Sequence, residues 1–137
     1  MKNFKASLEE LNYIVEYIVQ ELPKGCVIIL QGDLASGKTT LTKAFVKYFN
    51  ITQEVTSPTF SIQQCYGENI FHYDIYNDGV DKFLELGLLE ELENEGYHLI
   101  EWGDEKLITI LSHAEIPTLV VEISKVDEKR AYKVSHA

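Results

Sequence analysis

The chain has 137 residues, 45% of them hydrophobic, and this length and composition suit one globular domain with a single core. Its formal charge of −10 disfavours direct, tight binding to nucleic acid or to an anionic membrane. Neither a disulfide framework nor a zinc site is indicated, because the two cysteines, Cys26 and Cys65, are not arranged as a CxxC pair. Both cysteines are expected in the core. No apolar stretch has the length of a signal peptide or a membrane span, so we expect a cytoplasmic protein.

The first expected helix begins at the capping box Ser7-Leu8-Glu9-Glu10 and stops at Pro23-Lys24-Gly25. An apolar run from residue 26 indicates a buried strand to about Gln31, and a second helix is expected to reach about Asn50. Next we expect a hairpin of residues 59–66 and 69–76 turning at Gly67-Glu68, and a helix over 81–94 interrupted at Gly87. A buried strand over 97–102, a short helix over 104–113 and a second hairpin of 117–126 and 130–135 complete the chain order. The hairpins predict a mixed sheet.

The segment Gly32-Asp33-Leu34-Ala35-Ser36-Gly37-Lys38-Thr39 fits the phosphate-binding pattern GxxxxGK[ST] and joins the first expected strand to the second expected helix. In this pattern the glycines turn backbone N–H groups toward the phosphates, Lys38 supplies charge to the β/γ oxygens, and the Thr39 hydroxyl is placed to ligate Mg²⁺. The phosphates would then lie at a helix N-terminus. The sequence therefore predicts an α/β fold in which residues 1–137 form a single P-loop NTPase-like domain, with a mixed central sheet flanked by helices.

Two further segments carry groups suited to phosphate chemistry. The segment Val55-Thr56-Ser57-Pro58-Thr59-Phe60 offers three hydroxyls around a rigid proline; it is either a segment that senses the γ-phosphate or an ordinary loop. On the strand that follows, alternation places His72, Asp74 and Tyr76 on one face. Asp74 is a candidate Mg²⁺ ligand. The alternatives are a polar cluster without a catalytic role and, with only two ligands visible, a transition-metal site of His72 and Asp74.

Glu101 ends an apolar strand, where P-loop NTPases place a carboxylate near Mg²⁺ and the attacking water. It is our first choice for orienting or activating that water, the alternative being a capping acid for the helix that begins near Asp104. Trp102 is either a packing anchor or a ring that covers the nucleotide. The glutamates between residues 85 and 95 are explained by a solvated helix face or by a docking surface for a basic partner.

Arginine is nearly absent, since Arg130 is the only one in the chain. Enzymes of phosphoryl transfer commonly use arginine to stabilise the transferring group, so either Lys38 and Mg²⁺ suffice or a partner supplies an arginine in trans. Guanine recognition is disfavoured: Ser124-Lys125-Val126-Asp127 resembles the NKxD element but has Ser in place of Asn, and no DxxG occurs.

The order GDLASGKTT, VTSPTF, HYDIYN and IEWGD resembles the TsaE (YjeE) family, small bacterial P-loop ATPases of tRNA threonylcarbamoyladenosine biosynthesis. The resemblance spans nearly the whole domain. It implies a weak Mg²⁺-dependent ATPase that works with TsaD and TsaB, the complex that transfers a threonylcarbamoyl group to an adenosine beside the tRNA anticodon. tRNA would be met only through that complex, and ATP hydrolysis would reset it between cycles without performing the acyl transfer.

The resemblance also implies roles for individual residues. Lys38, Asp74 and Glu101 would serve hydrolysis, and Thr39, Asp74 and Glu101 would serve the metal. The residues expected to contact ATP are Asp33, Leu34, Ala35, Ser36, Gly37, Lys38, Thr39, Thr40, Thr59 of the switch segment and Trp102 beside the site.

Two departures from the family pattern bear on these roles. Asn77 stands where the family commonly has arginine, which puts in doubt any role of that basic side chain, and Ala35-Ser36 replaces the frequent Gly-Ala of the phosphate loop. Two other functions are open to a chain with a phosphate loop. A small-molecule kinase would need an acceptor-binding lid and usually several arginines, and a non-hydrolysing nucleotide-gated scaffold would have no need of Asp74 and Glu101.

Overall fold

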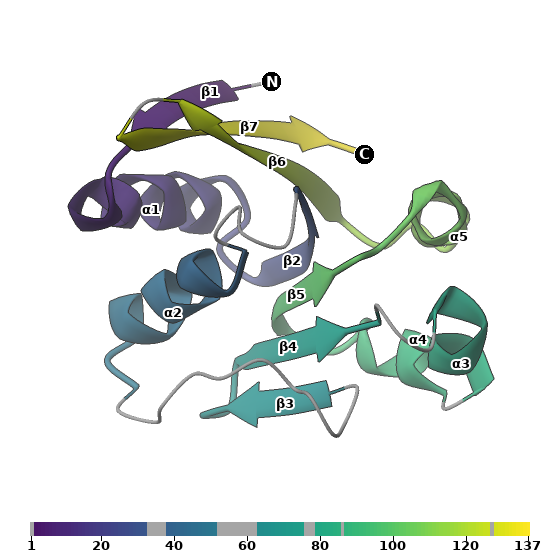
Figure 1. The fold of residues 1–137 in the computed structure, drawn as a ribbon. Helices are drawn as coiled ribbons and strands as arrows, with labels where there is room; N and C mark the ends of the chain where they lie inside the picture. Colours follow the sequence, from purple (N-terminus) through teal and green to yellow (C-terminus); the bar gives the residue numbers. More distant parts are fainter. Residues whose placement is uncertain (1, 33–37, 52–62, 76–78, 86, 127) are drawn as a thin grey trace.

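The computed structural model describes residues 2–32, 38–51, 63–75, 79–85, 87–126 and 128–137. The described strands form one mixed sheet in the order β1-β7-β6-β2-β5-β4-β3 (Figure 1). The strands are β1 (Lys2–Ala6), β2 (Gly25–Gln31), β3 (Gln63–Tyr66), β4 (Ile70–Asp74), β5 (Gly96–Glu101), β6 (Thr118–Val126) and β7 (Lys129–His136). The helices are α1 (Leu11–Glu21), preceded by a 3₁₀ turn η1 (Leu8–Glu10), α2 (Lys38–Tyr48), α3 (Gly79–Glu85), α4 (Leu88–Glu91) and α5 (Glu105–His113).

The middle of the sheet is parallel and buried on both faces. β2 pairs in parallel with β5 on one side and with β6 on the other, and β4 continues the parallel part beyond β5. Residues 26–30 of β2 are all buried, which explains why their sequence is a continuous apolar run without alternation. The carboxyl ends of β2, β4 and β5 therefore meet at one edge of the sheet.

Helices cover the sheet on two sides, as Figure 1 shows. Alternate residues of β2 point to opposite faces: Ile28 and Leu30 belong to the core cluster that includes α1 and α2, whereas Val27 and Ile29 belong to the cluster that includes α3, α4 and α5. The molecule thus has three layers, with the sheet between two sets of helices. Among the described residues, no helix is long and apolar enough to cross a membrane.

The expected mixed sheet is confirmed by three antiparallel pairs at the flanks of the parallel strands. β3 pairs with β4, β6 pairs with β7, and β1 pairs with β7. β1 was not expected from the sequence, and it is held only along β7 at the edge of the sheet. The prediction that both cysteines lie in the core is wrong for Cys65, which is exposed on the edge strand β3, while Cys26 is buried in β2.

The helix boundaries follow the capping signals of the sequence. The Ser7 N–H donates to Glu10 Oε1 at 3.0 Å, so the capping box is present, although it opens the 3₁₀ turn rather than α1 itself. Hydrogen bonds from the Ser7 backbone and from Lys129 lower the pKa of Glu10 to about 2. Asp104 caps α5, accepting a hydrogen bond from the Leu107 N–H at 3.0 Å. Gly87, with φ +72°, separates α3 from α4 at the expected interruption.

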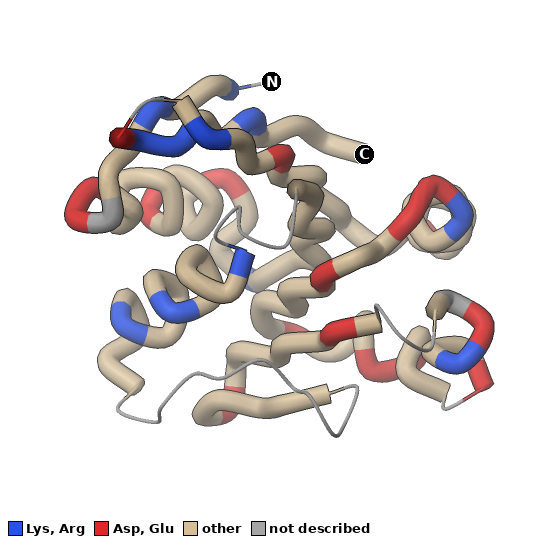
Figure 2. Tube along the Cα trace, viewed as in Figure 1, with Lys and Arg blue, Asp and Glu red and all other residues tan. Residues whose placement is uncertain are grey.

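Charge is unevenly distributed over the fold. Residues 74–115 contain twelve carboxylates and two lysines, so this acidic segment carries a formal charge of −10, equal to that of the whole chain. The remaining residues hold ten acidic and ten basic side chains. Figure 2 shows acidic residues gathered over α3, α4 and α5, and basic residues on α2 and on the hairpin of β6 and β7. The glutamates between residues 85 and 95 are exposed, as both a solvated face and a docking surface would require, and Glu93 and Glu95 lie beyond the end of α4.

Candidate functional site

The carboxyl edge of the parallel strands gathers the predicted reactive groups. Asp74 is the last residue of β4 and Glu101 the last of β5, and the two lie opposite each other in the parallel register. At the same edge, β2 ends at Gln31, just before the phosphate-binding segment, and α2 begins with Lys38 and Thr39. The topology therefore brings residues that are 27 to 63 positions apart in the sequence to one edge.

Glu101 contacts the first turn of α2. Its side chain is buried, with 5% of the residue exposed, and the Thr39 hydroxyl donates to Glu101 Oε2 at 3.2 Å. The alternative role as a helix cap does not describe it, because Asp104 is the residue that caps α5. The predicted metal ligands Thr39 and Glu101 thus lie within hydrogen-bonding distance of each other.

Lys38 is a buried cation with 3% of its surface exposed. Its ammonium donates to the Gly32 carbonyl at 2.7 Å and lies 3.8 Å from the centre of the Trp102 ring, which gives a cation–π contact. Removing an ammonium from water is unfavourable unless polar groups or anions compensate it. This burial makes the position suited to an anionic ligand, and the contact with Lys38 places Trp102 beside the start of α2.

The chain turns sharply after Glu101. Trp102 has φ +70°, in the left-handed region that costs a non-glycine residue roughly 1–2 kcal/mol. Residues held in such conformations often lie at functional sites, where the surrounding structure fixes them. The turn ends β5 and lets Trp102 reach the Lys38 ammonium while Glu101 faces α2.

His72 also contacts Glu101, and the sequence did not predict this contact. Its ring is fully buried in β4, and Nε2 lies 2.5 Å from Glu101 Oε2. The expected alternation holds, because Tyr73 and Ile75 belong to the core cluster on the other face. For His72 the sequence suggested a polar cluster without a catalytic role or a transition-metal site. The signal for its contact with Glu101 is the register of β4 against β5, which no local pattern reveals.

The remaining predicted site residues fall into two groups. Thr40 lies half-buried in the first turn of α2. Residues 33–37, Thr59 with its hydroxyl segment, and Asn77 lie outside the described residues. In the part of the chain that the structure describes, no three His, Cys, Asp or Glu side chains form a group that could hold a metal ion by themselves.

Arg130 lies in β7, and β6 and β2 separate β7 from the strand that carries Glu101. With neighbouring strands about 4.8 Å apart, this places β7 about 14 Å from β5. The only arginine of the sequence is therefore not part of the group formed by Lys38, Thr39 and Glu101.

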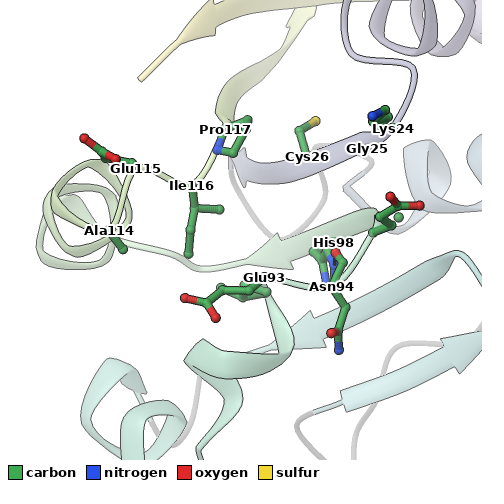
Figure 3. Close-up of a pocket in the computed structure, with 13 residues that line it drawn as sticks. Lys24, Gly25, Cys26, Glu93, Asn94, His98, Ala114, Glu115, Ile116 and Pro117 are labelled. Atoms are coloured by element: carbon green, nitrogen blue, oxygen red, sulfur yellow. Dashed lines mark hydrogen bonds between the residues drawn. The ribbon is translucent and has the colours of Figure 1, made fainter.

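A pocket of about 300 Å³ lies at the opposite edge of the sheet, where the parallel strands begin (Figure 3). Its lining includes Cys26, His98 and Pro117. Both nitrogens of His98 have partners: Nε2 donates to the Asn94 carbonyl at 2.9 Å, and Nδ1 accepts from the Tyr73 hydroxyl at 3.0 Å. Burial lowers the pKa of His98 and raises the pKa of Cys26 to about 12. These groups are poorly suited to proton transfer or nucleophilic attack at neutral pH.

Comparison with known sequences decides the family. A sequence pattern for the family described as "Threonylcarbamoyl adenosine biosynthesis protein TsaE" matches residues 5–132. The chain belongs to the TsaE family. The family is involved in tRNA threonylcarbamoyladenosine biosynthesis, as the motif order in the sequence implied.

Individual TsaE proteins match over most of the chain. The tRNA threonylcarbamoyladenosine biosynthesis protein TsaE of Bacillus subtilis is 38% identical over 98 residues, which cover 69% of this chain and 61% of that protein. The match thus spans less than two thirds of the length of that relative. The TsaE of Treponema pallidum is 34% identical over 106 residues, covering 75% of this chain and 74% of the relative.

A solved structure supports the fold. The crystal structure of Bacillus subtilis YdiB superimposes with a TM-score of 0.68 at 28% sequence identity, covering 99% of this chain and 86% of that one. The predicted fold class is confirmed: a single α/β domain of the P-loop NTPase fold, with a mixed sheet flanked by helices.

Proposed function

We propose that this TsaE-family protein binds ATP with Mg²⁺ at the carboxyl edge of its parallel strands and hydrolyses it to ADP and phosphate. The observation that carries the proposal is the contact of Thr39 with Glu101, next to the buried Lys38 ammonium. A phosphate-loop hydroxyl, a strand-end carboxylate and a buried cation are the groups that P-loop NTPases use to hold and hydrolyse a triphosphate.

The residues at this edge fit Mg²⁺. That ion prefers oxygen ligands and is commonly held by one or two carboxylates together with substrate phosphates, so it needs no complete cage of protein ligands. Thr39, Asp74 and Glu101 offer a hydroxyl and two carboxylates at neighbouring positions. When bound, the ion would neutralise charge on the phosphate oxygens.

In the proposed reaction, a water oxygen forms a bond to the γ-phosphorus while the bond from that phosphorus to the bridging oxygen breaks and ADP leaves with the electron pair. One proton of the water stays on the phosphate that forms, and the other is released to solvent. Glu101 accepts a hydrogen bond from the water and orients it. Lys38 binds the β/γ oxygens, giving up its contacts with the Gly32 carbonyl and the Trp102 ring. Because those oxygens are already charged in bound ATP and gain charge as the bond to ADP breaks, Lys38 should affect binding as well as turnover.

We further propose that the protein acts with TsaB and TsaD in modifying tRNA. The family supports the pathway, and the position of Arg130 supports a need for a partner, because no arginine of the described residues lies beside Glu101. An arginine supplied in trans would complete the charge stabilisation that Lys38 and Mg²⁺ begin. tRNA would be contacted through the complex.

Binding and turnover can be measured on the same variants. Trp102 is the only tryptophan of the chain, and its contact with the Lys38 ammonium makes its fluorescence a reporter of nucleotide binding. Glu101→Gln, which removes the charge but keeps the shape, should lower kcat about 100-fold and leave ATP affinity within about threefold. Lys38→Met should weaken ATP binding tenfold or more and lower turnover too.

Lys43→Met is the matched control for Lys38→Met, because Lys43 is exposed on the same helix. It should leave both binding and turnover unchanged. If Glu101→Gln weakens binding and Lys38→Met does not, the assigned roles are wrong. Tight binding without turnover in any condition favours a scaffold, and transfer of the γ-phosphoryl group to a metabolite favours a kinase. If TsaB and TsaD change neither affinity nor turnover, the partnership is refuted.

A further inference from the structure

His72 has no assigned role, although it is the closest described side chain to the reactive end of Glu101. Its ring is fully buried, so it meets neither solvent nor ligand directly. Nε2 is 2.5 Å from Glu101 Oε2, closer than the Thr39 hydroxyl, which lies 3.2 Å from the same oxygen. A group in this position acts on the chemistry through Glu101.

The two contacts of Glu101 converge on one oxygen. Nε2 of His72 and the hydroxyl of Thr39 both approach Oε2, and no described group donates to Oε1. One carboxylate oxygen is thereby held from β4 and from α2, while the other is left for whatever occupies the site. Two donors on a single oxygen fix the rotation of a carboxylate more tightly than one donor does.

The burial of His72 costs stability that an apolar residue would not cost. Among the described residues its Nδ1 is buried without a hydrogen-bond partner, and an unsatisfied buried nitrogen is unfavourable. His98 offers a contrast one strand away, since both of its nitrogens are bonded. Packing alone therefore does not explain an imidazole at position 72, whereas the contact with Glu101 does.

We propose that His72 is the positioning residue of Glu101: Nε2–H donates to Oε2 and, with Thr39, holds the carboxylate so that Oε1 faces the attacking water. The proposal rests on the proposed hydrolysis and adds a residue to its machinery. His72 does not touch substrate, so it should influence kcat and leave the affinity for ATP unchanged.

The first test compares substitutions at His72. His72→Leu fills the space without a donor and should lower kcat by roughly 10- to 100-fold, with KM and the Trp102 binding signal unchanged. His72→Gln carries an amide N–H near the position of Nε2 and should recover most of the loss. His98→Leu is the matched control, because it removes an equally buried histidine from the neighbouring strand; it should lower thermal stability but not the kcat of the folded protein.

The second test asks whether His72 acts through Glu101. In a Glu101→Gln background, His72→Leu should cause no further loss of kcat, since the carboxylate that it orients is already gone. Independent, additive losses would overturn the proposal, as would a full loss in His72→Gln or a change confined to KM.

A third measurement does not depend on turnover, and it distinguishes a failure of the proposed ATP hydrolysis from a failure of the positioning role of His72. Long-range ¹⁵N–¹H NMR spectra of the intact protein should show His72 protonated at Nε2, with a shift of that resonance in Glu101→Gln that His98 does not share. If the wild-type protein hydrolyses no ATP with or without its partners, the proposed function fails while this signal still tests the contact. If hydrolysis is found and the signal is absent, the positioning role fails alone.

Discussion

The buried polar side chains of the protein form two sets, one at each edge of the sheet, and the two sets differ in their hydrogen-bond partners. At the carboxyl edge, Lys38, His72 and Glu101 are buried, with Lys38 bonded to the Gly32 carbonyl and His72 in contact with Glu101. At the amino edge, His98 is buried with its ring stacked on Phe71 at 4.5 Å and with partners on both nitrogens. In the first arrangement no described group donates to Glu101 Oε1, whereas in the second both ring nitrogens are bonded within the fold.

This difference predicts how stability depends on pH. Burial lowers the pKa of His98 below its ordinary value of 6.5, against smaller opposite effects of the Asn94 carbonyl and Glu91. The unfolded chain therefore takes up a proton near pH 6.5 that the folded protein resists. The contribution of His98 to the free energy of unfolding is complete above pH 6.5. It is lost as the pH falls toward the pKa of His98 in the folded protein, by at most about 1.4 kcal/mol per pH unit.

The measurement is urea unfolding of the wild type and of His98→Leu between pH 7.5 and 5. We expect a shallower loss of stability in the variant over this range, whatever its stability at pH 7.5. An equal slope in both proteins contradicts the assignment, because the variant has no group at position 98 to titrate.

At the scale of elements, the parallel strands β2 and β5 begin with two glycines that are partners in the register. Gly25 lies opposite Gly96 in the register, with φ +109°, and a Cβ at position 25 would lie 2.0 Å from the Gly96 carbonyl oxygen. Gly25→Ala should therefore cost about 3 kcal/mol or more of unfolding free energy, since both the backbone angle and the space forbid a side chain.

Gly87 provides the matched control for this substitution. It also has a positive φ, +72°, but an added Cβ would meet nothing within 4 Å. Gly87→Ala should cost only the roughly 1–2 kcal/mol of the left-handed conformation. Urea midpoints of the two variants measure the difference, and equal costs would mean that β2 and β5 can separate at little expense.

Much at this scale could be predicted from local sequence. The caps, the periodicities and the turn glycines located α1, α2, α5 and the hairpins, because each signal acts within a few residues. The strand end at Glu101 was likewise visible as an apolar run that stops in an acid. The role of Glu101 as a strand-end carboxylate needed no knowledge of its neighbours.

What local sequence did not predict depends on contacts between distant strands. β1 has a largely exposed sequence and exists because β7 offers it a partner. Cys65 was placed in the core, but β3 is an edge strand, and only the strand order shows this. The contact of His72 with Glu101 follows from the register of β4 against β5, which no pattern within either strand encodes.

For the whole molecule, the uneven distribution of charge makes stability depend on the salt concentration. The acidic segment of residues 74–115 carries the entire net charge of −10, so its carboxylates repel one another across α3, α4 and α5, which Figure 2 shows together. Salt screens such repulsion between exposed charges, because the Debye length falls from about 30 Å at 0.01 M to about 3 Å at 1 M. Unfolding separates these charges and relieves their repulsion, so screening favours the folded state.

We therefore expect the melting temperature to rise by about 3 to 6 °C when NaCl is raised from 0.02 to 0.5 M, corresponding to roughly 1 kcal/mol for a domain of this size. Replacing Glu90, Glu93 and Glu105 by Gln should raise the melting temperature at low salt and reduce this increment, because all three are exposed within the acidic segment. The matched triple replacement of Glu9, Glu16 and Glu21, exposed in the part of the chain whose charges balance, should leave the increment nearly unchanged. Equal increments in the two triple variants would mean that salt acts on the molecule as a whole rather than on the acidic segment.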